Sequence, residues 1–127
     1  MTALCLCMAL FGLPSCDAKK NGAAAYTSVP MAEGIRMMAA DTDFVLLDVR
    51  RPDEYAAGRI PGAVLCTNED MTKEDMLSRF SDTEQTLYVY CRSGRRSKEA
   101  SGKLASWGYT DVVEIGGINS YTGPIER

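Results

Sequence analysis

The sequence predicts an α/β fold in which a central parallel sheet has helices on both faces. From about residue 28 onwards, short apolar runs rich in branched side chains alternate with helix-like segments. Strands that are buried on both faces have such continuous apolar runs, and repeated strand–helix units place helices over both sides of a parallel sheet. The 127 residues, 46% of them hydrophobic and 24% charged, suit one globular domain whose core needs no disulfides.

The first half of the domain is predicted to contain two helices and two strands. The first helix begins at Pro30, a residue suited to a first helical turn, and apolar residues then recur at helical spacing. Residues 44–49 form an apolar run typical of a buried parallel strand. A short helix over residues 52–57 ends at Gly58, and residues 63–66 form the next strand.

The second half repeats this alternation. Thr72 is expected to cap a helix that extends to Phe80. A strand over residues 87–90 is followed by a helix over residues 95–107, and the last strand covers residues 112–115. This order of elements predicts an open parallel sheet, whose ligands bind beyond the carboxyl ends of the strands.

The segment with the clearest chemical potential begins at Cys91, directly after the third predicted strand. A cysteine in that place has its sulfur above the N-terminus of a helix, where backbone N–H groups and the helix dipole favour the nucleophilic thiolate. Gly94 permits the positive φ of a tight loop. Arg92, Arg95 and Arg96 supply positive charge for binding a planar or tetrahedral anion.

Charge and residue content exclude several other classes of function. The net charge is −3 and the pI is about 4.9, which disfavours non-specific nucleic-acid binding. The chain has five cysteines and no histidine, so it has no Cys-His or Ser-His catalytic pair and no histidine-based metal site. Cys5 and Cys7 lack the spacing of a zinc knuckle, and we expect no metal ion.

The loop over residues 91–96 resembles the six-residue active loop of the rhodanese family. The string DVRRPDEYAAGRIPGA over residues 48–63 is similar to a second signature of that family. Gly116-Gly117-Ile118, followed by Tyr121, is similar to its C-terminal glycine pair. The likeness covers roughly residues 28–124, and its signatures occur in the family's order. Two positions depart from the family: Arg59 stands where histidine is common and Tyr121 where tryptophan is common. Both positions look structural.

The resemblance implies a rhodanese-like fold and a sulfurtransferase that works in two steps. Cys91 is the implied catalytic residue: it attacks the outer sulfur of a donor such as thiosulfate, releases sulfite and keeps the sulfur as a persulfide. A thiol or cyanide then removes that sulfur, and no cofactor is required. The implied substrate-binding residues are those of the loop, with the largest loss expected on removal of Arg96: Arg92, Ser93, Gly94, Arg95 and Arg96.

Other residues near these signatures are interpreted as structural. Asp48 is expected to anchor loops through hydrogen bonds, with Arg50 as a supporting residue. Arg59 and Glu54 are expected in ion pairs and away from the substrate. Cys66 is expected to fill a strand end, with a role as resolving thiol as the alternative.

Two competing functions remain open. A phosphatase or arsenate reductase of related fold requires an arginine at position 97, where this chain has Ser97. A second alternative uses the same fold as a non-catalytic sulfur carrier, redox sensor or binding module. A sulfurtransferase would take up a sulfur atom at Cys91 and then turn over, which distinguishes it from both alternatives.

The N-terminal residues predict export. Residues 1–15 read as a signal peptide, because an apolar, uncharged stretch ends in Leu13-Pro14-Ser15 before Cys16. The pattern resembles a bacterial lipoprotein cleavage site, so Cys16 is the expected site of lipid attachment to a membrane. Residues 16–27 then form a tether and residues 28–127 the domain. No Lys or Arg precedes the apolar stretch, and the alternatives are an ordinary secretory signal or an apolar extension of a cytoplasmic protein.

Overall fold

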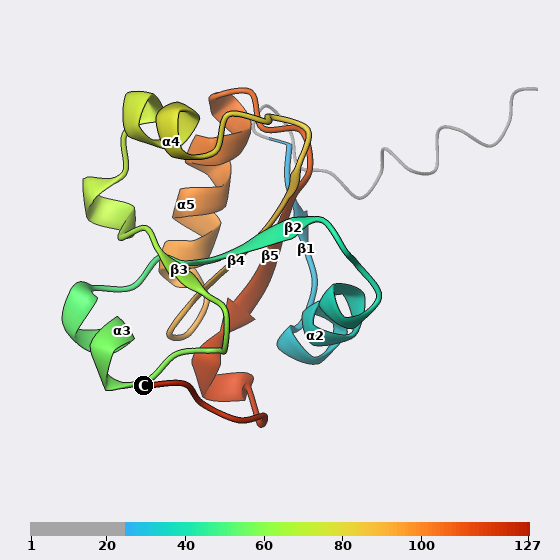
Figure 1. The fold of residues 1–127 in the computed structure, drawn as a ribbon, viewed down its shortest axis with the longest axis vertical. Helices are drawn as coiled ribbons and strands as arrows, with labels where there is room; N and C mark the ends of the chain where they lie inside the picture. The colour runs from blue at the N-terminus through green and yellow to red at the C-terminus, as the bar shows by residue number, and fades with distance from the viewer. Residues whose placement is uncertain (1–24) are drawn as a thin grey trace, which may run out of the picture.

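The computed structural model describes residues 25–127, which form a parallel five-stranded sheet with helices on both faces (Figure 1). The strand order is β1-β5-β4-β2-β3 and every pairing within it is parallel. The strands are β1 (Thr27–Ser28), β2 (Phe44–Asp48), β3 (Val64–Leu65), β4 (Thr86–Cys91) and β5 (Val112–Gly117). The helices are α2 (Met31–Ala39), α3 (Pro52–Ala57), α4 (Lys73–Arg79) and α5 (Arg95–Ser106), with short 3₁₀ turns η2 (Asn68–Asp70) and η3 (Ile118–Ser120). The predicted fold class is confirmed.

Most predicted elements occur within two residues of their predicted bounds. The helix over residues 52–57 agrees at both ends, and Thr72 does cap α4, since its Oγ1 accepts a hydrogen bond from the Asp75 N–H at 3.2 Å. The 3₁₀ turn η2 and the edge strand β1 were not predicted, because each has only two or three residues and so no readable periodicity. Thr27 of β1 pairs with Val113, which places the end of the predicted tether in the sheet.

The predicted signal peptide and Cys16 lie outside the described residues. Within the described part of the chain, no helix combines the length and the apolar composition needed to cross a bilayer.

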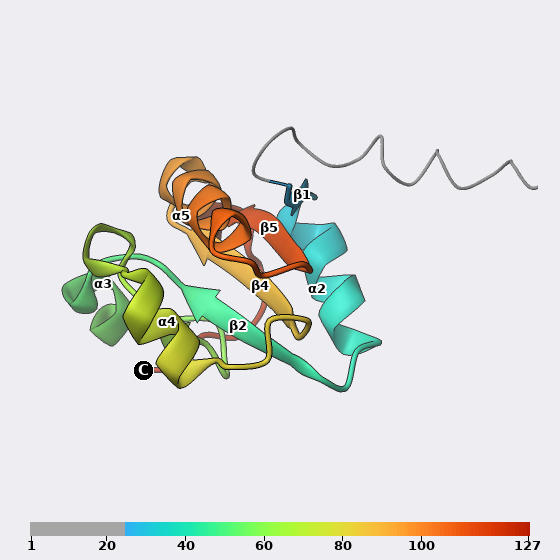
Figure 2. The ribbon, with the colours of Figure 1, turned by 90° about the horizontal axis from the view of Figure 1, so that it is seen from above.

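The two faces of the sheet bury separate apolar clusters. Viewed along the sheet, α4 and α5 lie on one side and α2 lies on the other (Figure 2). Leu47, Val89 and Leu104 belong to the cluster under α4 and α5, whereas Leu46 and Ile115 belong to the cluster that includes residues of α2. Successive strand residues therefore serve opposite faces, which explains why these strands are apolar throughout.

The carboxyl end of β5 packs directly against the loop that follows β4. A Cβ atom on Gly117 would collide with the backbone carbonyl of Arg92, so only glycine permits this approach. The same carbonyl accepts a hydrogen bond from the Asn119 N–H at 3.1 Å. The loop after Cys91 is thus held between the start of α5 and the segment that follows β5.

Candidate active site

Cys91 is the last residue of β4, and its side chain is 1% exposed. The chain turns back immediately, so that the Gly94 N–H donates a hydrogen bond to Cys91 Sγ at 3.0 Å. Gly94 has φ 114° and is the N-cap of α5, a conformation that other residues rarely adopt. The first N–H groups of α5 have no acceptor within the helix, which begins directly after the Gly94 that contacts the sulfur. The predicted strand–cysteine–helix arrangement is therefore present.

A buried polar pair lies behind the sulfur and was not identified from the sequence. Ser97 Oγ is 3.5 Å from Cys91 Sγ and donates a hydrogen bond to the carboxylate of Glu114. Glu114 is 1% exposed and also accepts hydrogen bonds from the Gly116 N–H at 2.8 Å and the Ser28 hydroxyl at 2.9 Å. The available signal was a carboxylate within the apolar run of the last strand. Ser97 itself is fully buried, so the position that a phosphatase loop requires for arginine has no cation.

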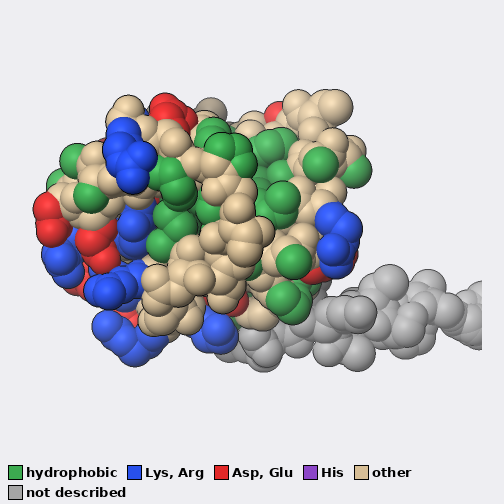
Figure 3. Space-filling model, turned by 90° about the horizontal axis from the view of Figure 1, so that it is seen from below, with side chains coloured by type: hydrophobic (Ala, Val, Ile, Leu, Met, Phe, Trp, Pro, Cys, Tyr) green, Lys and Arg blue, Asp and Glu red, His purple; other side chains and the backbone are tan. Residues whose placement is uncertain are grey.

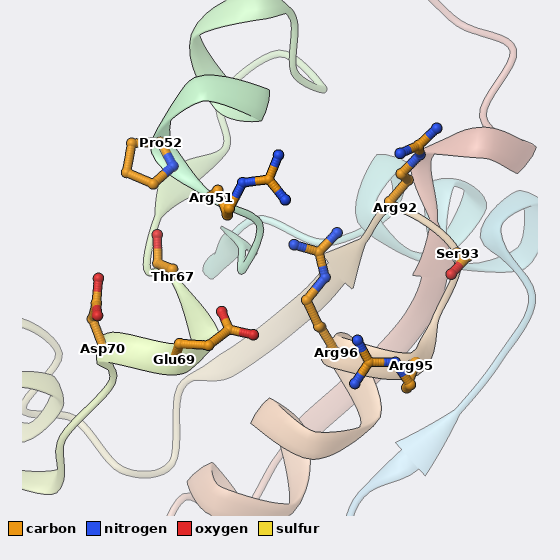
Figure 4. A pocket seen from close by; sticks show the side chains of 9 residues that line it. All are labelled: Arg51, Pro52, Thr67, Glu69, Asp70, Arg92, Ser93, Arg95 and Arg96. Atoms are coloured by element: carbon orange, nitrogen blue, oxygen red, sulfur yellow. The ribbon is translucent and has the colours of Figure 1, made fainter.

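An open cavity of about 600 Å³ borders the loop (Figure 4). Cys91 is not one of its lining residues, whereas four residues of the loop that follows it are. The cavity is lined by residues from four segments: Arg51 and Pro52, Thr67, Glu69 and Asp70, and Arg92, Ser93, Arg95 and Arg96. Of the predicted substrate-binding residues, the cavity therefore brings together all except Gly94, which instead contacts Cys91.

The three loop arginines differ in their ion pairs. Arg96 forms two hydrogen bonds to the carboxylate of Glu54, at 2.8 and 3.2 Å, and both side chains are 12% exposed. Its hydrogen bonds are the main reason that the pKa of Glu54 is lowered to about 2. Arg95 pairs with Glu99 at 3.1 Å on the exposed side of α5. Arg92 is exposed and has no ion-pair partner among residues 25–127, so its charge is available to a ligand.

Asp48 and Arg50 hold neighbouring strand ends together and lie outside the main cavity. The Asp48 carboxylate accepts hydrogen bonds from Arg50, at 2.7 to 3.2 Å, and from the Tyr90 hydroxyl at 2.6 Å. Burial, together with this hydrogen bond, raises the pKa of Tyr90 above its ordinary range. The backbone carbonyl of Asp48 accepts the Cys66 N–H at 2.9 Å. Asp48 therefore links the strand that leads to Cys91 with the strand that leads to Cys66.

Cys66 occupies a different environment from Cys91. It is 5% exposed and lines a smaller cavity of about 230 Å³ together with Met71, Met76 and Arg79. Burial raises the pKa of the Cys66 thiol to about 11. At neutral pH this thiol is protonated, which supports the structural interpretation over a role as resolving thiol.

The two departures from the family pattern lie away from the main cavity. Arg59 pairs with Glu126 at 3.4 Å, and its guanidinium lies over the ring of Tyr55 at 4.4 Å from the centroid. The Tyr121 hydroxyl donates a hydrogen bond to the carbonyl of Pro124 at 2.9 Å. Arg59 ties Glu126 to the domain, and Tyr121 packs against the apolar cluster that includes Ile115.

Sulfurtransferases of known name are similar to this chain. It is 33% identical over 78 residues to the thiosulfate sulfurtransferase PspE of Escherichia coli (strain K12), which covers 61% of this chain and 74% of that protein. It is 28% identical over 108 residues to the thiosulfate sulfurtransferase GlpE of Pseudoalteromonas translucida (strain TAC 125), with 81% of this chain and 99% of that protein covered.

Solved structures agree with these relatives. A structure described as a rhodanese with anions from E. coli superposes with a TM-score of 0.60 at 31% identity, covering 65% of this chain and 96% of that chain. A rhodanese-like domain protein from Staphylococcus aureus superposes with a TM-score of 0.67 at 28% identity, covering 78% and 95%. The family model of the rhodanese-like domain matches residues 31–123, which include every strand from β2 to β5. The chain therefore belongs to the rhodanese-like domain family.

Proposed function

We propose that this protein is a sulfurtransferase that moves a sulfane sulfur from thiosulfate, or a related anionic donor, to a thiol or cyanide. One observation supports this most directly: a backbone N–H points at the sulfur of a strand-end cysteine, beside a cavity lined by arginines. An N–H donor at that position stabilises negative charge on the cysteine sulfur or on a persulfide attached to it. The relatives named as thiosulfate sulfurtransferases support the same assignment.

The reaction proceeds in two displacements at sulfur. The Cys91 thiolate attacks the outer sulfur of thiosulfate, a new S–S bond forms, and the original S–S bond breaks with its electron pair leaving on sulfite. Cys91 now holds a persulfide whose terminal sulfur is electrophilic. A thiolate or cyanide attacks that terminal sulfur, and the electron pair of the broken S–S bond returns to Cys91. The product is a persulfide of the acceptor, or thiocyanate.

The ion pairs revise which arginine is expected to bind the donor. From the sequence, Arg96 was expected to matter more than Arg92. In the structure Glu54 already neutralises Arg96, whereas Arg92 has no such partner among the described residues. We propose that Arg92 provides the main contact to the anionic donor, and that Arg96 chiefly keeps the Glu54 charge away from it.

A double substitution separates these two roles. Arg96→Ala alone leaves the Glu54 carboxylate with Arg51 at 3.8 Å as its remaining ion-pair partner, so the less neutralised carboxylate weakens thiosulfate binding by repulsion. Arg96→Ala combined with Glu54→Gln then restores binding if Arg96 only neutralises Glu54. A combined variant that binds thiosulfate as weakly as Arg96→Ala would show that Arg96 contacts the donor itself.

Arg92→Ala is expected to lower kcat/KM for thiosulfate about tenfold or more, because one charge-assisted contact to the donor is lost.

The central experiment is mass spectrometry of the protein after incubation with thiosulfate. We expect a gain of one sulfur atom that maps to Cys91 and is absent from Cys91→Ser. Release of thiocyanate on addition of cyanide, over many cycles, identifies an enzyme. Loading without turnover favours a sulfur-carrier function, as the name of one relative suggests: the putative sulfur carrier protein YrkF of Bacillus subtilis (strain 168) is 30% identical over 88 residues. If Cys91 gains no sulfur from thiosulfate or from other sulfane donors, the proposed sulfurtransferase function is wrong.

We also propose that the protein is exported and attached to a membrane through lipid on Cys16. The support is the residue pattern alone, an apolar stretch that ends with Ser15 before a cysteine. Cells that express the full chain are labelled with a radioactive fatty acid. Label on the parent and none on Cys16→Ala is the expected result, and equal label on both would exclude this anchor.

A further inference from the structure

The cavity beside the active loop has two walls of opposite charge. Its volume of about 600 Å³ is far greater than thiosulfate or cyanide requires and lies in the range of cavities that bind organic molecules. Figure 4 shows Arg92 on one side, and Glu69 and Asp70 on the opposite side. Seen from the carboxyl ends of the strands, the surface likewise has Lys and Arg side chains next to acidic ones (Figure 3).

The acidic wall is held in place although its carboxylates are free. Glu69 and Asp70 belong to η2, and neither carboxylate has a hydrogen bond or ion pair with another residue in the described range 25–127. The turn itself is tied to α5 through Asn68, which is 3% exposed. The Asn68 side-chain amide donates a hydrogen bond to Glu99 at 3.0 Å, and the backbone carbonyl of Asn68 accepts one from Lys103 Nζ at 2.7 Å. The backbone that carries the two carboxylates is therefore anchored to α5, the helix that begins at the active loop.

The basic wall contains one arginine with an uncommitted charge. Arg96 is paired with Glu54, Arg95 with Glu99, and Arg51 with Asp53 at 3.0 Å. Arg92 is left as the cavity's free cation among the described residues. A ligand that carries both an ammonium and a carboxylate would complement both walls, whereas an inorganic anion complements only the basic one.

We infer that the acceptor bound in this cavity is a zwitterionic thiol, that is, a cysteine-containing amino acid or short peptide with a free amino and a free carboxyl group. Its ammonium faces Glu69 and Asp70, and its carboxylate faces Arg92. Its thiolate attacks the terminal sulfur of the Cys91 persulfide, and the electron pair of that S–S bond returns to Cys91. This inference rests on the proposed function and adds the chemical class of the acceptor to it.

The test uses four forms of the tripeptide Gly-Cys-Gly as acceptors: free at both ends, acetylated at the amino end, amidated at the carboxyl end, and blocked at both. The protein is first loaded with sulfur from thiosulfate, and the loss of sulfur from Cys91 is followed by mass spectrometry. The free peptide should react with a kcat/KM several-fold above that of the doubly blocked one. Each single block should lower the value by about two- to fivefold, the range expected for an ion pair open to solvent.

Substitutions in the cavity test which wall causes the preference for each free end of the peptide. Glu69→Gln with Asp70→Asn should remove the preference for a free amino end and keep the preference for a free carboxyl end. Arg92→Gln should do the reverse. Glu74→Gln and Arg36→Gln are matched controls, because both side chains are exposed and lie outside this cavity, and both preferences should persist in them.

The outcomes separate this inference from the function on which it depends. If Cys91 does not load with sulfur, the sulfurtransferase proposal fails. If Cys91 loads and all four peptides remove the sulfur equally well, the sulfurtransferase stands and the zwitterionic acceptor is excluded. If the preferences for free peptide ends stay unchanged in the cavity variants, Glu69, Asp70 and Arg92 do not bind the ends of the acceptor.

Discussion

Cys91 and Cys66 are the two cysteines of the described domain, and by most measures they are alike. Both are buried, both lie at or just beyond the carboxyl end of a parallel strand, and both belong to the apolar cluster under α4 and α5. They differ in the next segment of the chain. After Cys91 the chain forms a glycine-containing loop and a helix of twelve residues, and a backbone N–H reaches the sulfur at 3.0 Å. After Cys66 it forms a short 3₁₀ turn, and the cysteine borders a cavity lined by Met71, Met76 and Arg79.

Burial and position at a strand end are therefore shared by the cysteine that we propose as the nucleophile and by the one that we interpret as structural. A buried thiol among apolar groups is held in its neutral form, which agrees with the raised pKa of Cys66. Burial beside main-chain donors has a different effect, because those donors compensate for lost water around a charged sulfur. The difference depends on a few residues after each cysteine, and single substitutions can test it.

Replacing the reactive sulfur should have the largest effect. Cys91→Ser should reduce sulfur transfer by at least about a thousandfold, because the nucleophile itself is lost. Cys66→Ser should keep most of the activity and serves as the matched control. The measurement is thiocyanate formation from thiosulfate and cyanide, and a large loss in Cys66→Ser would mean that both thiols take part.

Removing the shared anchor should destabilise both strand ends. Asp48→Ala leaves the buried Arg50 guanidinium without its carboxylate and the Tyr90 hydroxyl without its acceptor. Breaking a buried ion pair in this way costs about 3–5 kcal/mol in the free energy of unfolding. Urea unfolding followed by circular dichroism measures this, with Asp53→Ala, which removes an exposed ion pair, as the control. A loss below about 1 kcal/mol would contradict the anchoring role.

Straining the active loop should separate activity from stability. Gly94→Ala forces alanine to φ 114°, at a cost of about 1–3 kcal/mol. Gly108→Ala imposes a similar strain at φ 106°, beyond the far end of α5. We expect comparable losses of stability in the two variants, but slower sulfur loading only in Gly94→Ala. Equal loading rates would show that the loop conformation around Cys91 is not needed for reaction.

The smallest effect concerns the pH dependence of Cys66. Its pKa is raised in the folded protein, so the folded state holds this proton more tightly than the unfolded state does. The resulting stability is present below about pH 9 and is lost as the pH rises towards 11. Between about pH 7 and pH 10.5, the parent should therefore lose more unfolding free energy than Cys66→Ala. Equal losses in both proteins would show that the thiol is not held in its neutral form by the fold.

The fold and the strand–loop–helix arrangement around Cys91 could be predicted because their signals are local. Branched apolar runs identify the buried strands, and a cysteine between such a run and a helix that starts with arginines identifies the loop. The ion pair between Arg96 and Glu54 joins residues 42 positions apart, so the sequence indicated that Glu54 would be paired but not with which residue. Ser97 and Glu114 were missed for the same reason, since their hydrogen bond connects α5 to β5. The strand β1 and the turn η2 are too short to produce a pattern.

The contact between Gly117 and the Arg92 carbonyl limits how this site can diverge. A loop lengthened by one residue, as a larger oxyanion would require, pushes against a backbone that has no room to yield. The strand β5 would have to retreat, and the buried Glu114 carboxylate would move with it. We therefore expect a longer loop after Cys91 to require a compensating change in the segment around Gly117.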